Sequence, residues 1–231
     1  MSDMGLKEFA REYRKRDAGL KGLDGSPEAV RKQNIEAGRK NFRTFCNLRN
    51  PEFFKPERTY QDDICNTLQA AYEKCLINEK TGQPYDILII NEPPGFGKSY
   101  TASTFITWVY GQNPKAQVIS VSYNQTLSLT FSKTVREAIN DEEIAGDLGY
   151  YAVESFFPDV RIKYGDGAME RWSLEGSYMS YLATSFDGSI TGMRGNIGII
   201  DDPIKNDKEA VNDNTKEAIW SFYKNTFSSR M

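Results

Sequence analysis

The stretch Glu92-Pro93-Pro94-Gly95-Phe96-Gly97-Lys98-Ser99 decides the fold expected for this chain of 231 residues. It follows a short apolar run, Asp86-Ile87-Leu88-Ile89-Ile90-Asn91, and it opens a helical pattern over residues 98–110. The run lacks polar alternation, which predicts a strand buried on both faces, as in a parallel sheet. A glycine-containing loop between such a strand and a helix is typical of a phosphate-binding loop.

The residue types of this loop suit a bound phosphate chain. Gly95 and Gly97 allow unusual dihedrals and a close approach of backbone N–H groups to phosphate oxygens. The Lys98 ammonium would reach the β- and γ-phosphates, and the Ser99 hydroxyl would bind Mg²⁺. Because Glu92 replaces the first glycine of the usual pattern, an ordinary strand-to-helix turn is the alternative. Further nucleotide contacts are expected from Pro94, Phe96 and Tyr100.

A second pattern, Ile199-Ile200-Asp201-Asp202, ends a buried strand expected over residues 197–200 with two carboxylates. At the carboxyl end of a parallel strand, Asp201 would hold the metal ion and Asp202 would polarise the attacking water. Asp207 and Glu209 are the next candidates for the catalytic carboxylate. The alternative is a capping turn, since Asp before Pro commonly opens a turn.

A third pattern, Tyr60-Gln61, lies ahead of the loop. The Gln61 amide offers a donor and acceptors, so it can read the edge of an adenine base. The alternative is an ordinary surface glutamine.

The rest of the chain predicts alternating helices and strands. Helices are expected over residues 5–17, 26–45, 60–77, 126–140 and 207–227, with Ser26 as an N-cap. Strands are expected over residues 117–123 and in a hairpin of residues 171–174 and 178–183. This order is the βαβ signature of an α/β protein. The strand between the loop and the acidic pattern favours a motor-type ATPase, without excluding a nucleotide kinase.

Composition excludes several classes of chemistry. The chain has no histidine, which excludes Ser-His-Asp and Cys-His catalysis and leaves oxygen ligands, suited to Mg²⁺, for any metal. Cys46, Cys65 and Cys75 form no metal-ligand spacing, which indicates reduced thiols in a cytoplasm. No apolar run approaches the roughly 20 residues of a membrane span, so we expect a soluble protein with no membrane partner.

Charge is distributed unevenly along the chain. Residues 1–50 hold 12 basic and 7 acidic residues, a net charge of +5, although the whole chain carries −3. A basic segment on an acidic body is compatible with nucleic-acid contact. A solvated helical surface is the alternative.

The motifs together resemble those of the large subunit of tailed-phage terminases, over about residues 55–231. The resemblance includes Tyr60-Gln61, the residues 93–99, Val118-Ile119-Ser120-Val121-Ser122-Tyr123, Phe131-Ser132-Lys133-Thr134-Val135-Arg136, Ile190-Thr191-Gly192-Met193-Arg194-Gly195, Ile200-Asp201-Asp202-Pro203-Ile204-Lys205-Asn206, a helix with Ala210 and Trp220, and the closing Ser229-Arg230-Met231.

This resemblance implies an α/β fold of the RecA-like P-loop class, with a mostly parallel sheet flanked by helices. It implies a helical extension over residues 1–50 and an ATPase domain over residues 51–231. Lys98 and Ser99 would form the Walker A pair, Asp201 the Walker B carboxylate, Asp202 the catalytic carboxylate and Gln61 the adenine reader. ATP hydrolysis with Mg²⁺ would drive double-stranded DNA into a procapsid, in the cytoplasm of an infected bacterial host. The implied partners are the portal protein, the small terminase subunit and further copies in a ring, although the isolated chain could be a monomer.

The sequence departs from the terminase pattern in two ways. Many terminases carry arginine where Gly95 stands, so another arginine must complete the site. Arg194 ranks first as an arginine finger, followed by Arg171 and Arg136. The coupling strand and the nuclease domain that follow in terminases are absent, so we expect a C-terminally truncated chain without DNA cutting.

Three rival functions stay open at this point. A helicase-like translocase would need a second motor lobe. A P-loop phosphotransferase would use ATP faster when an acceptor is added. A non-catalytic nucleotide-binding module would release no phosphate.

Overall fold

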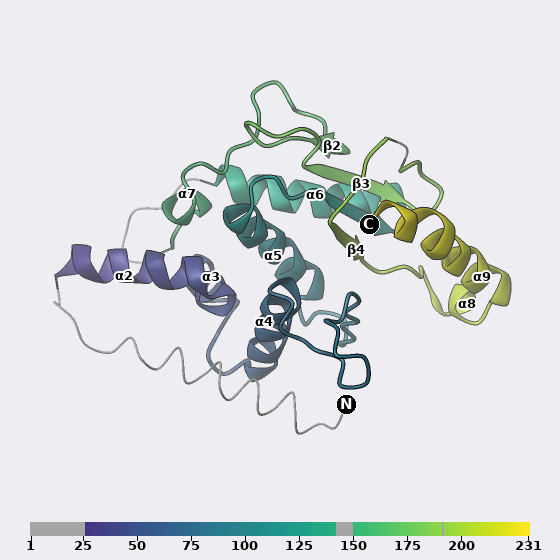
Figure 1. The fold of residues 1–231 in the computed structure, drawn as a ribbon, viewed down its shortest axis with the longest axis horizontal. Coiled ribbons are helices and arrows are strands. Elements are labelled where there is room, and N and C mark those ends of the chain that lie inside the picture. The colour runs from purple at the N-terminus through teal and green to yellow at the C-terminus, as the bar shows by residue number, and fades with distance from the viewer. Residues whose placement is uncertain (1–25, 142–149, 191) are drawn as a thin grey trace. The chain divides into compact units, whose positions relative to one another are not determined.

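The computed structural model describes residues 26–141, 150–190 and 192–231 (Figure 1). The helix expected over residues 5–17 lies outside the described residues. The chain divides into a first compact unit, Met1–Lys98 with Ile144–Tyr151, and a second, Ser99–Glu143 with Ala152–Met231. The border between these units follows Lys98.

The described part of the first unit begins with two helices, α2 (Pro27–Lys40) and α3 (Phe42–Arg49). Ser26 caps α2 as expected, because its hydroxyl accepts a hydrogen bond from the Ala29 N–H at 3.3 Å. The single helix expected over residues 26–45 is broken at Asn41, which has extended backbone dihedrals. Its side chain accepts a hydrogen bond from the Thr44 N–H at 2.7 Å and thereby starts α3.

The next helix, α4 (Thr59–Tyr72), ends five residues earlier than the sequence predicts. Lys74 adopts a left-handed conformation with φ of 58°. Its N–H donates to the Ala71 carbonyl, and the Cys75 N–H donates to the Ala70 carbonyl, which is the pattern of a Schellman C-cap. Glycine normally occupies this position, so no residue in the sequence indicated that α4 ends here.

The apolar run before the loop differs most from its prediction. No strand covers residues 86–91, and Ile87 and Ile89 are 61% and 85% exposed. The prediction of a buried strand is therefore wrong for this structure. A strand forms only where a neighbouring strand accepts and donates its backbone hydrogen bonds, and the described residues give this run no such neighbour.

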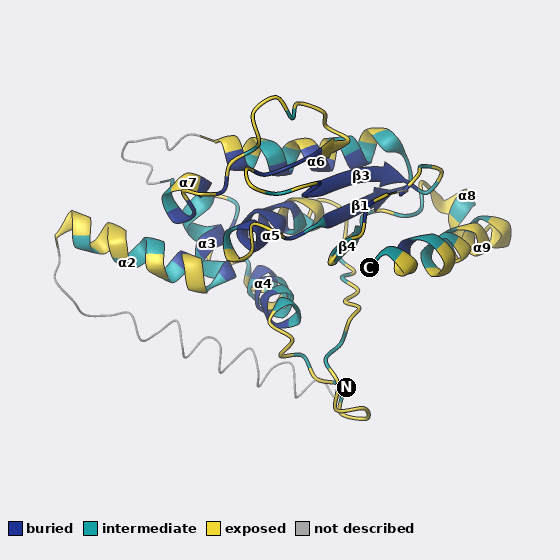
Figure 2. Cartoon of the chain, turned by 45° about the horizontal axis from the view of Figure 1, so that its top comes forward, coloured by how far each residue is buried: buried dark blue, intermediate teal, exposed yellow. Residues whose placement is uncertain are grey.

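The second unit contains a four-stranded sheet in the order β2-β3-β1-β4. The strands are β1 (Val118–Ser122), β2 (Arg171–Trp172), β3 (Tyr181–Ser185) and β4 (Ile197–Ile200). β1 runs parallel to β3 and to β4, and β2 pairs antiparallel with β3. The predicted α/β class with a mostly parallel sheet is confirmed. β1 and β3 are buried throughout, whereas the edge strand β4 is only partly buried (Figure 2).

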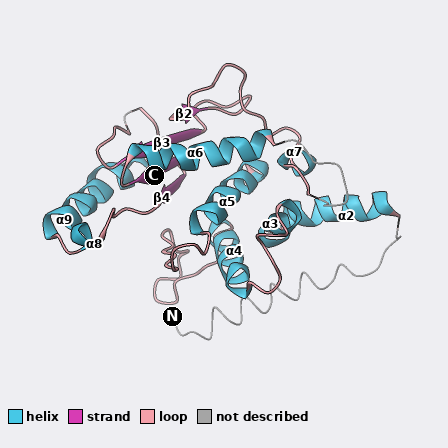
Figure 3. Ribbon diagram, turned by 180° about the vertical axis from the view of Figure 1, so that it is seen from behind, coloured by secondary structure: helices cyan, strands magenta, loops and turns pink. Residues whose placement is uncertain are grey.

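The main helices of the second unit are α5 (Lys98–Gln112) and α6 (Gln125–Asn140), both close to their predicted bounds (Figure 3). Residues 103–110 of α5 are all buried, and the Tyr110 hydroxyl donates to the Ser180 carbonyl at 2.7 Å. Shorter helices follow, namely α7 (Val153–Phe156), α8 (Asp207–Ala210), α9 (Asp213–Phe222), the π-helical η2 (Tyr223–Phe227) and the 3-10 helix η3 (Ser228–Arg230). The predicted helix over residues 207–227 is thus interrupted, because Asn212 caps a new start. Within the described ranges, no helix has the length and apolar character needed to cross a membrane.

Candidate nucleotide site

The loop before α5 has the backbone that its glycines predict. Gly95 and Gly97 adopt left-handed conformations, with φ of 84° and 82°. Space around Gly95 is open, whereas a methyl group on Gly97 would overlap the ring of Phe53. Gly97 is therefore required for its dihedrals and for the close approach of Phe53.

Lys98, the first residue of α5, turns its side chain back onto this loop. Its Nζ donates to the carbonyl oxygens of Glu92 and Pro93, at 2.6 and 3.3 Å. The Glu92 Oε2 atom is buried and has no hydrogen-bond partner among the described residues. Burial raises the pKa of the Glu92 carboxyl, and the positive charge of Lys98 partly opposes that rise.

An aromatic contact joins the tip of the loop to α4. Phe96 is 41% exposed, and its ring lies 5.1 Å from the ring of Tyr60, tilted by 52°. The residue after Tyr60 is Gln61, the predicted adenine reader. The structure therefore brings Tyr60, the first residue of the predicted pair, to the predicted phosphate-binding loop.

Gln61 is buried without a protein partner. Its side chain is 1% exposed, and neither its amide nitrogen nor its amide oxygen has a hydrogen-bond partner in the described residues. Buried amides of this kind are rare, because an unmade hydrogen bond in the interior costs about 1–3 kcal/mol. The amide thus has full capacity for a ligand or a water molecule.

The acidic pair lies at the carboxyl end of the parallel strands in the second unit. The Asp201 N–H donates to the Val121 carbonyl at 2.9 Å, which extends the pairing of β4 with β1 by one residue. The Asp202 carbonyl then accepts from the Tyr123 N–H at 3.3 Å. Asp202 has φ of 49°, a left-handed conformation that is uncommon outside glycine and that often marks functional sites.

The two further candidates for the catalytic carboxylate, Asp207 and Glu209, both lie in α8. Glu209 accepts a hydrogen bond from the Lys205 N–H at 3.2 Å, so it helps to close the turn before the helix. Asp207, the first residue of α8, is exposed. Glu209 thus has a capping role and Asp207 a surface position, as expected of ordinary carboxylates.

The three candidate arginines differ in their surroundings. Arg136 donates to the Gly167 carbonyl at 2.8 Å and lines a pocket of about 400 Å³ beside α6. Arg194 and Arg171 are exposed, and their side chains form no hydrogen bond or ion pair within the described part of the chain. Arg194 is therefore available to act elsewhere, whereas Arg136 holds a loop of its own unit.

The remaining predicted contacts lie along the loop and the first turn of α5. Pro94, Ser99 and Tyr100 are exposed. The Tyr100 carbonyl accepts hydrogen bonds from Ser103 and Thr104 inside the helix, so its side chain is not needed for those bonds. Among the described residues, no group of three or more aspartate, glutamate or cysteine residues is arranged to hold a metal ion.

Two residues near the loop belong to none of the predicted patterns. Phe53 lies against Gly97, and Arg43 of α3 binds the segment that carries Phe53. Phe53 lies 44 positions before Gly97, and Arg43 lies 11 and 12 positions before the carbonyls that it binds, so neither residue belongs to a local pattern. Comparison of the sequence with known protein families and with curated proteins found no match.

Proposed function

We propose that this chain is an ATP-hydrolysing P-loop domain that powers the packaging of double-stranded DNA, as in the large subunit of a phage terminase. One observation carries the ATPase part of this proposal. Two left-handed glycines, Gly95 and Gly97, lead directly to Lys98 at the first position of a 15-residue helix. The terminase part rests on the run of motifs in residues 55–231.

Phosphate oxygens would replace the two carbonyl oxygens that now accept hydrogen bonds from Lys98. An ammonium group binds anionic oxygens more strongly than neutral carbonyls, so the exchange is favourable. The N-terminus of α5 adds backbone N–H donors and the positive end of the helix dipole. Lys98 would then stabilise the charge that develops on the transferred phosphoryl group.

Gln61 would read the adenine base. A glutamine amide can donate to one adenine nitrogen and accept from the exocyclic amine, as in protein contacts with adenine in DNA. Such binding would satisfy the two amide atoms that lack partners in the described structure. The neighbouring rings of Tyr60 and Phe96 would supply apolar surface for the base.

Mg²⁺ fits the residues that this chain offers. Mg²⁺ prefers oxygen ligands, usually one or two from the protein with the rest from phosphates and water. Ser99 and Asp201 would provide those protein oxygens, and the bound ion would neutralise phosphate charge. Asp202 would accept a hydrogen bond from the attacking water, and its carboxylate follows directly after the metal ligand in the chain.

A RecA-like organisation is part of the same proposal. In it, the apolar residues 87–90 would join the parallel sheet as an additional strand. Their exposed isoleucines would then leave water, and their backbone groups would gain partners. We expect this pairing to accompany nucleotide binding or assembly of the motor.

Assembly would involve partners beyond this chain. We propose a ring of copies on the portal of a procapsid, with double-stranded DNA and the small terminase subunit, in the host cytoplasm. Arg194 would act as the arginine finger on the neighbouring subunit, because it is exposed and unpaired within the described residues. Specific ATPase activity should then rise with protein concentration, and chains with Lys98→Ala should regain activity when mixed with Arg194→Ala chains.

Phosphate release by the purified chain with Mg²⁺ and ATP tests the proposed function. Lys98→Ala should reduce turnover by about a thousandfold, since it removes the main cation at the transferred phosphate. Lys115→Ala removes an exposed lysine outside the candidate site and serves as the matched control. Equal turnover in the wild-type chain and in a folded Lys98→Ala chain would refute the assignment.

A further inference from the structure

We propose that Arg43 is a positioning residue of the nucleotide site, and this inference rests on the function proposed above. Arg43 lies on α3 and belongs to none of the predicted patterns. It fixes residues 53–62, a segment of the first unit that contacts the phosphate-binding loop through two aromatic side chains. Loss of Arg43 should therefore weaken nucleotide binding and the preference for adenine more than it slows hydrolysis.

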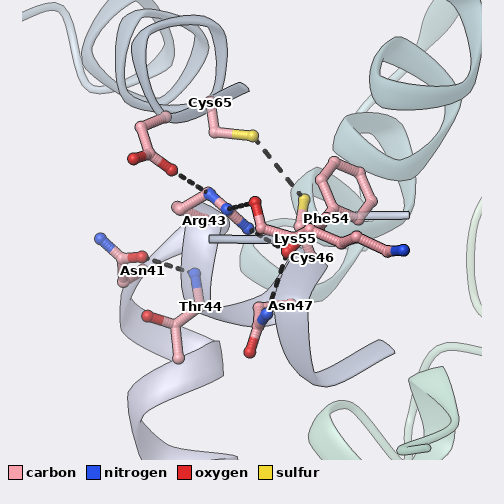
Figure 4. Close-up of polar contacts among 9 residues, drawn as sticks. Asn41, Arg43, Thr44, Cys46, Asn47, Phe54, Lys55 and Cys65 are labelled. Atoms are coloured by element: carbon pink, nitrogen blue, oxygen red, sulfur yellow. Dashed lines mark hydrogen bonds and ion pairs between the residues drawn. The ribbon is translucent and has the colours of Figure 1, made fainter. Parts of the chain in front are cut away.

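The guanidinium group of Arg43 binds both ends of this segment (Figure 4). At one end, its two terminal nitrogens donate to the carbonyl oxygens of Phe54 and Lys55, at 3.2 and 3.3 Å. At the other end, its Nε forms an ion pair with Asp62 at 2.5 Å. The Arg43 side chain is only 11% exposed, so solvent screens this ion pair weakly.

The segment held in this way touches the loop at two points. Phe53 precedes the first bound carbonyl, and its ring fills the space that a side chain on Gly97 would need. Tyr60, two residues before Asp62, contacts the ring of Phe96. Between Tyr60 and Asp62 lies Gln61, whose buried amide lacks a partner among the described residues.

Local structure alone does not fix the start of α4. Its N-cap residue is Arg58, whose side chain makes no capping hydrogen bond. The first turn, which carries Tyr60 and Gln61, therefore depends on other contacts for its position. Asp62 supplies one of them, because its carboxylate is bound by Arg43 from another helix.

Arginine is suited to this role in a way that lysine is not. The planar guanidinium presents donors in fixed directions, so one side chain can bind a carboxylate and two carbonyl oxygens together. A lysine would keep the charge next to Asp62 but would lose the fixed fork toward Phe54 and Lys55. We therefore expect the Arg43→Lys chain to keep only part of the nucleotide affinity that the wild-type chain has.

The test measures binding of ADP and GDP, and steady-state hydrolysis of ATP and GTP, by the full 231-residue chain. Arg43→Gln should raise the Kd for ADP about tenfold and reduce the preference for ADP over GDP, because the adenine reader loses its fixed position. The KM for ATP should rise in parallel, while kcat should change by less than about threefold. A purely structural role would lower the amount of folded protein without changing the base preference of the folded fraction.

Two further variants keep the test decisive if Arg43→Gln folds poorly. Arg43→Lys should give a Kd between those of the wild-type and Arg43→Gln chains. Arg49→Gln is the matched control on the same helix, since the Arg49 guanidinium donates to the Tyr151 carbonyl. It should leave both Kd values and the base preference unchanged.

Asp62 should act through the same contact. Asp62→Asn should shift the ADP Kd in the same direction, and the double variant with Arg43→Gln should be less impaired than the sum of the two single effects. Wild-type ADP affinity and base preference in folded Arg43→Gln and Arg43→Lys chains would overturn the inference alone. A wild-type chain that binds neither ADP nor ATP would instead overturn the proposed function, and the role of Arg43 with it.

Discussion

Two segments of this chain are both predicted to form strands, and their structures differ. The sequence predicts a buried strand over residues 86–91 and a second strand over residues 117–123. Val118–Ser122 forms β1, which is buried at all five positions and pairs with β3 on one side and β4 on the other. Residues 87–90 form no strand, and Ile89 is 85% exposed. Apolar composition thus predicts where a strand can form, but neighbours decide whether it does.

The loop that follows residues 87–90 is held in place by aromatic side chains and not by a paired strand. Phe53 lies against Gly97, and Tyr60 lies against Phe96. In most α/β nucleotide-binding proteins, a paired strand holds such a loop in place. In the structure described for this chain, aromatic contacts from the first unit provide that support.

The largest expected effect comes from placing a charge in each run. Ile119→Asp should destabilise the chain by about 4 kcal/mol or more, because Ile119 is fully buried in β1 and an unpaired carboxylate there is costly. Ile89→Asp should change stability by no more than about 0.5 kcal/mol, because the side chain is exposed. Urea unfolding of both variants measures the contrast. A loss of similar size for Ile89→Asp would mean that the run is buried in solution.

Hydrogen exchange with and without nucleotide sharpens the same comparison. Amides of β1 should be protected in both conditions, because both neighbouring strands bind them. Amides of residues 87–90 should exchange rapidly without nucleotide and gain about a hundredfold protection when Mg²⁺ and a non-hydrolysed ATP analogue are added. If nucleotide binds and these amides stay unprotected, the proposed extra strand is wrong.

A pair of glycine substitutions tests how the loop is supported. Gly95→Ala should cost about 1 kcal/mol, since its left-handed backbone is strained by a side chain that meets no neighbour. Gly97→Ala should cost about 2–3 kcal/mol, because the methyl group would also displace the Phe53 ring. Thermal unfolding of the two variants measures the difference. Equal losses would show that Phe53 does not hold the loop.

The smallest effect concerns the pH dependence of Glu92. Because burial raises its folded-state pKa, the folded chain binds this proton more tightly than the unfolded chain. The contribution of Glu92 to stability therefore falls as pH rises from about 4, where an ordinary glutamate ionises, through the raised folded pKa. Glu92→Gln should be more stable than the wild-type chain at pH 7, with the difference shrinking toward pH 4. A difference that grows on acidification would contradict the raised pKa.

Local chemistry made much of the fold predictable. The periodic pattern of α6, the β-branched residues of β1 and the serine cap at Ser26 each specify structure within a few residues. The end of α4 was not predictable, because a lysine rather than a glycine takes the left-handed position. It was also not predictable that residues 87–90 form no strand, because strand formation there depends on partner strands far away in the sequence.

The residues of the candidate site also divide into those that the sequence could predict and those that it could not. The left-handed dihedrals of Gly95 and Gly97 follow from the residue type that the sequence displays. The Gln61 amide has no hydrogen-bond partner among the described residues, which the Tyr60-Gln61 pattern alone could not indicate. Arg43 and Phe53 could not be predicted, because their contacts join helices and loops that no sequence motif links.

Binding of ADP to the purified chain tests the central claim most directly, because it needs no partner subunit and no DNA. Titration calorimetry with Mg²⁺ should show one site in the wild-type chain and in Lys115→Ala, the exposed control. Lys98→Ala should bind at least about tenfold more weakly, since a charged contact to the phosphates is lost. No binding by the wild-type chain, or the same affinity in all three, would contradict a nucleotide site built around Lys98.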